Sequence, residues 1–160
     1  MNEGESMKPG VFSQLYVQLV FAVKYRERLI KKEVQTEVYS YISGILTNRN
    51  NKSIIINGMP DHIHILTGLN HNEKIPDLVG AIKRNSSVYI NENQWIKNKF
   101  QWQEGYGAFS YSRSQIENVY EYIKNQEKHH KKKLFREEYV HLLKQFEIEY
   151  DERYLFSFFE

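Results

Sequence analysis

The histidines at positions 62 and 64 are spaced as two ligands of one metal ion could be. They lie in the segment DHIHIL, residues 61–66. Because side chains alternate between the two faces of a β-strand, a strand here would place both imidazoles on one face and Ile63 and Ile65 on the other. Two neighbouring imidazoles can share one metal ion. Taken alone, the pattern also fits two strand histidines that bind nothing.

A tyrosine and a glutamine form a second pair, in the segment VYEYIKNQEKHH, residues 119–130. In a helix, with about 100° per residue, Tyr122 and Gln126 lie within about 40° of each other, whereas Tyr120 lies about 120° from Gln126. Tyr122 and Gln126 therefore share a helix face, and Tyr120 does not. The same spacing also fits a core aromatic side chain on an amphipathic helix.

The elements that must position these residues follow from the periodicity of apolar side chains. Strands are expected at 14–23, 52–57, 62–68 and 106–111, and helices at 33–48, 75–90, 114–131 and 136–146. Gly58, Pro60 and Asp61 are turn formers between the second and third strands, which predicts a hairpin. Ser114 and Glu117 have the spacing of a capping box at the start of the third helix.

This order of elements, β-α-β-β-α-β-α with one further helix, predicts an α+β fold. The pattern is that of a ferredoxin-like or RRM-like sandwich with an antiparallel sheet. The chain has 160 residues and no linker or repeat, so we expect one domain over residues 1–160. Residues 1–10 are expected to form a flexible leader, and residues 147–160 an acidic and aromatic tail that docks on this subunit or its mate.

Composition restricts the kinds of site that the chain can build. There are no cysteines, which excludes disulfides and thiolate ligands and fits a reducing compartment. Apolar stretches such as Leu19–Val23 are far shorter than the roughly 20 residues of a membrane helix, and no signal peptide is recognisable, so a cytoplasmic location is expected. Residues 1–133 carry 19 Lys and Arg against 13 Asp and Glu, while residues 134–160 carry 3 against 7. A basic body fits an anionic partner, although an ordinary solvated surface has the same composition.

The motifs together resemble a known family. In order, they are the first strand with its basic turn, MPDHIHIL, IKRNSS, WQEGYGAFSYS, YIKNQEKHH and FREEYVHLL, spread over roughly residues 12–155. This series resembles the single-tyrosine HUH transposases of small bacterial insertion sequences and their REP-associated relatives. The resemblance implies a metal bound by His62, His64 and Gln126 and a nucleophilic Tyr122.

The resemblance also implies a reaction and its partners. The substrate would be single-stranded DNA from hairpin-forming element ends, and the intermediate a covalent 5′-phosphotyrosine with a free 3′-hydroxyl. A tyrosine hydroxyl with a reference pKa of about 10 needs a nearby cation, and Mg²⁺ or Mn²⁺ would supply it. Three neutral ligands leave that ion its positive charge, which favours an anionic substrate. A homodimer is implied, in which the tyrosine helix of one subunit can complete the histidine site of the other.

Several basic residues are candidates for holding DNA, each with ordinary solvated charge as the alternative. They are Lys24, Arg26, Arg28, Lys83, Arg84 and Lys128, the last at the start of a basic run to residue 133. Trp102 and Tyr106 could stack on unpaired bases or pack in the core. No distinct role follows from sequence for His129 and His130.

Three other functions remain open from the sequence. The protein could be a nucleic-acid binding module without chemistry, since ferredoxin-like sheets often bind single strands. It could be a domesticated relative that processes repetitive genomic hairpins. It could also be a hydrolase that uses the histidine pair with water as the nucleophile, in which case cleavage would survive loss of the Tyr122 hydroxyl.

Overall fold

The computed structural model describes residues 10–155 as four strands, five α-helices and three short 3₁₀ turns. The elements are β1 (Tyr16–Ala22), α1 (Lys32–Asn48), β2 (Lys52–Met59), β3 (His62–Gly68), α2 (Ile75–Glu92), β4 (Gly107–Tyr111), α3 (Ile116–Lys124), α4 (Gln126–His130) and α5 (Phe135–Gln145). The 3₁₀ turns are Lys24–Arg26, Arg113–Gln115 and Glu152–Tyr154. The expected leader and the end of the expected tail, residues 1–9 and 156–160, lie outside the described residues.

The four strands form one antiparallel sheet in the order β2-β3-β1-β4. This is the ferredoxin-like arrangement, so the α+β fold expected from the sequence is confirmed. β3 lies between β2 and β1, with His64 opposite Asn57 on one side and Val20 on the other. The histidine pair therefore stands in the interior of the sheet, away from either edge.

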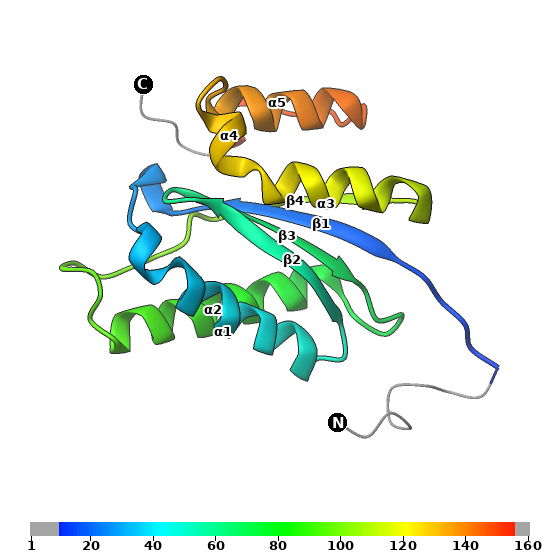
Figure 1. Cartoon of the computed structure of the whole chain (residues 1–160), viewed down its shortest axis with the longest axis horizontal. Helices are drawn as coiled ribbons and strands as arrows, with labels where there is room; N and C mark the ends of the chain where they lie inside the picture. The colour runs from blue at the N-terminus through cyan, green and yellow to red at the C-terminus, as the bar shows by residue number, and fades with distance from the viewer. Residues whose placement is uncertain (1–9, 156–160) are drawn as a thin grey trace.

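Helices cover both faces of the sheet. Figure 1 shows α1 and α2 on one face and α3, α4 and α5 on the opposite face. The main core contains Leu19, Phe21, Ile63 and Ile65, all with no exposed surface, packed with apolar side chains of α1 and α2. Burying each such side chain stabilises the fold by about 1.5–3 kcal/mol. The alternation of β3 thus sends its isoleucines to the α1 and α2 face and its histidines to the other.

The expected single helix over 114–131 is wrong, because the chain breaks at Asn125. Asn125 has φ −98° and ψ 27°, so α3 ends at Lys124 and α4 begins at Gln126. The amide of Asn57 on β2 donates hydrogen bonds to the carbonyls of Ile123 and Lys124, at 3.0 and 3.1 Å. These bonds satisfy carbonyl groups that a helix end leaves without partners.

The capping box also lies elsewhere than expected. Ser112 and Gln115 form it, with the Gln115 side chain accepting from the Ser112 backbone N–H at 2.9 Å. The extended backbone that a cap residue requires is found at Ser112, directly after β4, which explains why the expected pair of Ser114 and Glu117 is not used.

The C-terminal segment that the structure describes is only partly packed. Leu155 contacts the main core, whereas 81% of Tyr154 is exposed. Within residues 10–155, no helix combines the length and the apolar composition needed to span a membrane.

Candidate active site

The two histidines of β3 lie together under the α3 to α5 layer. Both are fully buried, and their ring centroids are 5.3 Å apart. Ile63 and Ile65 are buried on the opposite face of the sheet, so the predicted alternation is confirmed. The strand period alone brings the two imidazoles together.

His62 is oriented by a carboxylate and an aromatic ring. Its Nδ1–H donates to Asp61 at 2.7 Å, and Asp61 also pairs with Arg26 at 3.0 Å. Phe135 of α5 stacks on the imidazole, with centroids 3.8 Å apart. Burial alone would raise the pKa of Asp61, but its bonds to His62 and Arg26 outweigh burial and lower that pKa to about 2. The Asp61 contact fixes the His62 ring so that Nε2 points into the site, as in many metal-ligating histidines.

His64 is held by a glutamine on the neighbouring strand. The Gln18 amide donates to His64 Nδ1 at 2.8 Å, and the Tyr111 hydroxyl donates to Gln18 Oε1 at 2.6 Å. Burial lowers the pKa of His64 and favours the neutral imidazole. Gln18 and Tyr111 come from β1 and β4, so three strands contribute to the orientation of this ring.

Gln126 and Tyr122 reach the same site from the helix layer. Gln126 is fully buried, and its Oε1 lies 3.3 Å from His62 Nε2. The Tyr122 ring lies 6.2 Å from the His64 ring and stacks on His129 with centroids 4.6 Å apart. The histidines, tyrosine and glutamine singled out from the sequence therefore meet within one chain. Tyr120 lines a separate surface hollow, as its helical position predicts.

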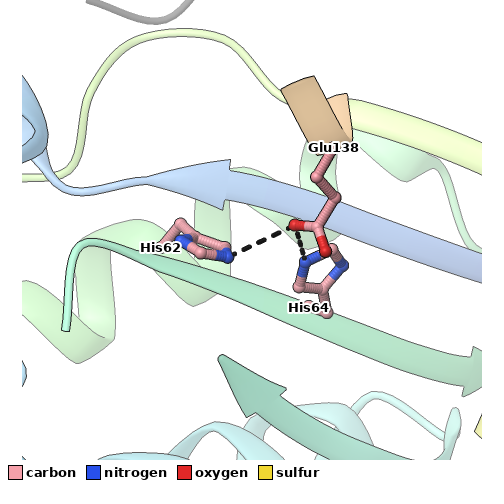
Figure 2. Close-up of side chains that lie close together, drawn as sticks. All are labelled: His62, His64 and Glu138. Atoms are coloured by element: carbon pink, nitrogen blue, oxygen red, sulfur yellow. Dashed lines mark hydrogen bonds and ion pairs between the residues drawn. The ribbon is translucent and has the colours of Figure 1, made fainter. Parts of the chain in front are cut away.

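A fifth residue of the site, Glu138 of α5, was missed by sequence reasoning. Figure 2 shows its carboxylate reaching from α5 to both imidazoles. Its Oε1 lies 3.0 Å from His64 Nε2 and 3.5 Å from His62 Nε2. It also lies 3.2 Å from His130 Nε2, which gives a structural place to one of the two histidines left without a role.

The other carboxylate oxygen of Glu138 faces the tyrosine and the glutamine. The Gln126 amide donates to Oε2 at 3.1 Å, and the Tyr122 hydroxyl donates to the same oxygen. Only 3% of Glu138 is exposed. A sequence signal for it exists, because Phe135, Glu138 and Tyr139 occupy one helical stripe, which places a carboxylate on the inward face of α5.

Glu138 is ionised and Tyr122 is protonated in this arrangement. Burial favours the neutral acid, but the interactions of the carboxylate with His64, His130 and His62 outweigh burial and hold the pKa of Glu138 well below its usual range. Burial, together with the Glu138 charge, raises the pKa of Tyr122. Burial disfavours the charged form of His62, yet its bonds to Asp61 and Glu138 raise its pKa overall. The cluster thus combines a carboxylate and a neutral phenol with the imidazoles of three histidines.

The donor set fits a divalent metal ion. One nitrogen from each of His62 and His64 and one oxygen from Glu138 all lie within 4.8 Å of one another, and all three residues are buried. Two imidazoles and a carboxylate suit divalent ions of the Mn²⁺ type, and carboxylates also suit Mg²⁺. The ligands inferred from sequence were all neutral, and Glu138 adds an anionic group beside them.

The basic residues proposed for DNA holding do not form one cluster. Arg26 is paired with Asp61 inside the site. The Lys83 ammonium donates to the carbonyls of Gln103 and Gly105 at 2.8 and 2.7 Å, and burial lowers its pKa to about 8. The remaining four are exposed, namely Lys24, Arg28, Arg84 and Lys128.

Two hollows border these elements. One of about 610 Å³ lies beside Tyr122 and is lined by residues of α3, α4 and α5, by Lys132 and Lys133 between α4 and α5, and by Gln18 and Tyr111 of the sheet. The other, of about 780 Å³, is lined by Lys83, Arg84 and Trp102 near α2. Trp102 is largely buried and donates to Ser86 at 2.8 Å, so core packing is its main role.

The fold and the site define a class of protein: an antiparallel sheet with a buried histidine pair on an inner strand, covered by a helix that presents a tyrosine. Residues 11–126 match the family described as "Transposase IS200 like". The chain belongs to this IS200-like transposase family.

Individual relatives agree with the family. The chain is 27% identical over 124 residues to the ISDra2 transposase TnpA of Deinococcus radiodurans, covering 73% of this chain and 87% of the relative. The crystal structure of a proposed transposase from Deinococcus radiodurans R1 is similar, with a TM-score of 0.60 and 25% identity over 75% of this chain and 96% of that one. A REP-associated tyrosine transposase bound to a REP hairpin shares the fold, with a TM-score of 0.57 and 14% identity over 78% and 74% of the two chains.

Proposed function

We propose that this transposase cleaves and rejoins single-stranded DNA through a covalent 5′-phosphotyrosine on Tyr122. The observation that carries the proposal is the position of Tyr122 beside the buried cluster of His62, His64 and Gln126 in one chain. A tyrosine in such a cluster is suited to nucleophilic attack on a phosphodiester.

In the cleavage step, the Tyr122 oxygen forms a bond to phosphorus and the bond from phosphorus to the 3′-oxygen breaks. The tyrosine gives up its proton and the departing 3′-oxygen gains one. The energy of the phosphodiester is kept in the phosphotyrosine, so a 3′-hydroxyl can reverse the step without a nucleotide cofactor. This agrees with the lack of a Walker-type phosphate-binding motif in the sequence.

His62 and His64, with Gln126, would hold the divalent metal, Mg²⁺ or Mn²⁺. When bound, the ion supplies positive charge for polarising the phosphate and stabilising the tyrosine oxygen. Asp61 and Gln18 keep the two imidazoles in place for this role.

The proposed substrate is the hairpin-forming end of a mobile element or a repetitive genomic hairpin. Support comes from the basic body of the chain and from the fold shared with a relative whose structure contains a REP hairpin. A homodimer is also proposed, on family resemblance alone. Within one chain, Tyr122 lies beside His64, so the proposal assigns each subunit its own tyrosine.

The test uses labelled single-stranded DNA from the ends flanking the gene, incubated with Mg²⁺, Mn²⁺ or EDTA. Wild type is expected to form a metal-dependent protein–DNA adduct on a denaturing gel, and Tyr122→Phe to form none. Tyr120→Phe is the matched control, since it removes a hydroxyl from the same helix outside the site, and it should retain the adduct.

The other possible functions give different results in the same assay. Cleavage that persists in Tyr122→Phe would indicate hydrolysis by water. Binding without an adduct, over several candidate ends, would favour a binding module.

A further inference from the structure

The buried carboxylate of Glu138 accepts hydrogen bonds from side chains of the candidate site. His64 Nε2 and His130 Nε2 lie 3.0 and 3.2 Å from one oxygen, and the Gln126 amide lies 3.1 Å from the other. The Tyr122 hydroxyl donates to that second oxygen. The nucleophile is thus directed at a carboxylate, where the proposed cleavage requires it to face phosphorus.

A carboxylate and a phosphodiester present the same chemistry to these donors. Each is an anion with two oxygens that accept charge-assisted hydrogen bonds from imidazole, amide and hydroxyl groups. Both cannot share one buried site cheaply, because like charges repel strongly where water is excluded. A phosphate bound by the same donors would therefore compete with the Glu138 carboxylate.

We propose that Glu138 occupies the position of the scissile phosphate, and that α5 must withdraw this carboxylate before Tyr122 can attack DNA. The site as it stands is a closed state, in which the chain supplies its own anion in place of the substrate. This inference rests on the proposed function, since it concerns the phosphate that Tyr122 attacks.

The placement of α5 is consistent with such a movement. Four consecutive exposed residues, Lys131 to Leu134, connect it to α4. α5 packs on the sheet through side chains that belong to the main core, with Phe135 stacked on His62 and Tyr139 against Phe109, so its withdrawal has to be driven by the binding of DNA. The hollow of about 610 Å³ beside Tyr122 is lined by Glu138 and three further residues of α5, together with residues of α3, α4 and the sheet. Withdrawal of α5 would widen this hollow at Tyr122, where a strand of DNA has to enter.

The direct test compares the full chain with Glu138→Gln, which removes the charge and keeps the shape. The affinity for a fluorescein-labelled oligothymidylate is measured by anisotropy in EDTA, so that no metal contributes. Glu138→Gln is expected to bind about tenfold more tightly than wild type, because a buried like charge has been removed. Glu137→Gln changes an exposed neighbour on α5 and should alter the affinity by less than about twofold.

The same variants are then compared for Mn²⁺ binding by calorimetry and for adduct formation with element-end DNA. Faster adduct formation in Glu138→Gln is expected. Unchanged DNA affinity in EDTA with much weaker Mn²⁺ binding would overturn the proposal, since Glu138 would then be a permanent metal ligand. Tighter DNA binding in Glu138→Gln without an adduct in any variant would keep the phosphate position and reject the tyrosine chemistry.

A second measurement keeps the proposal testable if Glu138→Gln does not fold, as judged by circular dichroism. The chain has no cysteine, so Lys144→Cys on the exposed side of α5 can carry a single nitroxide label in an otherwise wild-type protein. Saturating single-stranded DNA should increase the label's mobility. An unchanged spectrum under conditions where anisotropy shows full binding would rule out withdrawal of α5.

Discussion

Asp61 links two side chains at the edge of the site, an imidazole and a guanidinium. It accepts from His62 on one oxygen and pairs with Arg26 through the other. Arg26 in turn lies over the ring of Phe135, 5.5 Å from its centroid, and Phe135 stacks on His62. Arg26, which the sequence suggested as a DNA-binding residue, therefore helps to position His62 through Asp61.

The ion pair makes stability depend on pH in a defined direction. The pKa of Asp61 is lowered from 3.8 to about 2 in the folded chain. A lowered pKa stabilises the fold above the unfolded value, so the contribution, about 2 kcal/mol, is complete above about pH 4 and lost as pH falls towards 2. Asp61→Asn should lower the free energy of unfolding by about this amount at pH 7, measured with urea.

The difference between wild type and Asp61→Asn should narrow as the urea titrations are repeated from about pH 4 down to about pH 2.5. Glu121→Gln, which alters an exposed carboxylate of α3, is the control and should match wild type throughout. A difference that stays constant down to the lowest pH would show that the charge of Asp61 is not its source.

Gln18 is the other residue whose role lies in supporting a ligand. Removing the amide that holds His64 Nδ1 should weaken metal binding about 10- to 100-fold, the usual effect of losing a partner of a ligating histidine. Gln18→Leu is the variant, and Mn²⁺ titration by calorimetry is the measurement. Gln145→Leu, on an exposed position of α5, should bind Mn²⁺ like wild type. If Gln18→Leu bound Mn²⁺ as tightly as Gln145→Leu, Gln18 would have no role in supporting the metal ligand.

The sequence predicts some of these residues well because their relations are local. His62 and His64 are two residues apart, and Tyr122 and Gln126 four apart, so one strand period and one helical turn suffice. Glu138 lies far from His64 in the chain and meets it only through packing of α5 on the sheet. The spacing of neighbouring residues cannot predict a contact between two residues so far apart in the chain.

The break between α3 and α4 shows the same limit for whole elements. Strand and helix order, the hairpin and the antiparallel sheet were all predictable from periodicity and turn residues. The break at Asn125 was not, because it depends on Asn57, a residue of β2 that bonds to the last carbonyls of α3. The break sets how Tyr122 on α3 and Gln126 on α4 meet the histidines.

Asn57→Ala tests this arrangement. Losing the two bonds to α3 should lower the free energy of unfolding by about 1 kcal/mol and also reduce adduct formation, because Tyr122 and Gln126 lose their fixed relation. Asn93→Ala removes a comparable amide bond to the carbonyl of Tyr89 at the end of α2, far along the chain from the site. It should cost similar stability and leave the adduct unchanged. Equal adduct levels in the two variants would contradict a role for the break.

At the scale of the whole molecule, the candidate active site and part of the basic surface lie on opposite faces of the sheet. The candidate active site lies under α3, α4 and α5, while Arg84 lies on α2, which covers the opposite face of the sheet (Figure 1). A DNA strand that reaches both would have to pass around an edge of the sheet. The effect of replacing Arg84 therefore shows whether bound DNA reaches the α2 face of the sheet.

Arg84→Gln should weaken single-stranded DNA binding and make its salt dependence shallower by about 0.7 in the logarithmic slope, the share of one phosphate contact. Anisotropy titrations at several salt concentrations measure this slope. Arg153→Gln, which removes an exposed arginine paired with Asp151 near the C-terminal end, is the control. Identical slopes for Arg84→Gln and wild type would confine DNA to the α3 to α5 side.

The gathering of His64, Gln126 and Tyr122 in one chain has a genetic consequence. When each protomer owns a full set of reactive groups, two differently damaged copies cannot repair each other. A mixture of a His64→Ala protein and a Tyr122→Phe protein would then remain inactive. Sites shared between two subunits would instead let the mixed dimer regain one working set, so complementation between the two damaged genes separates the arrangements.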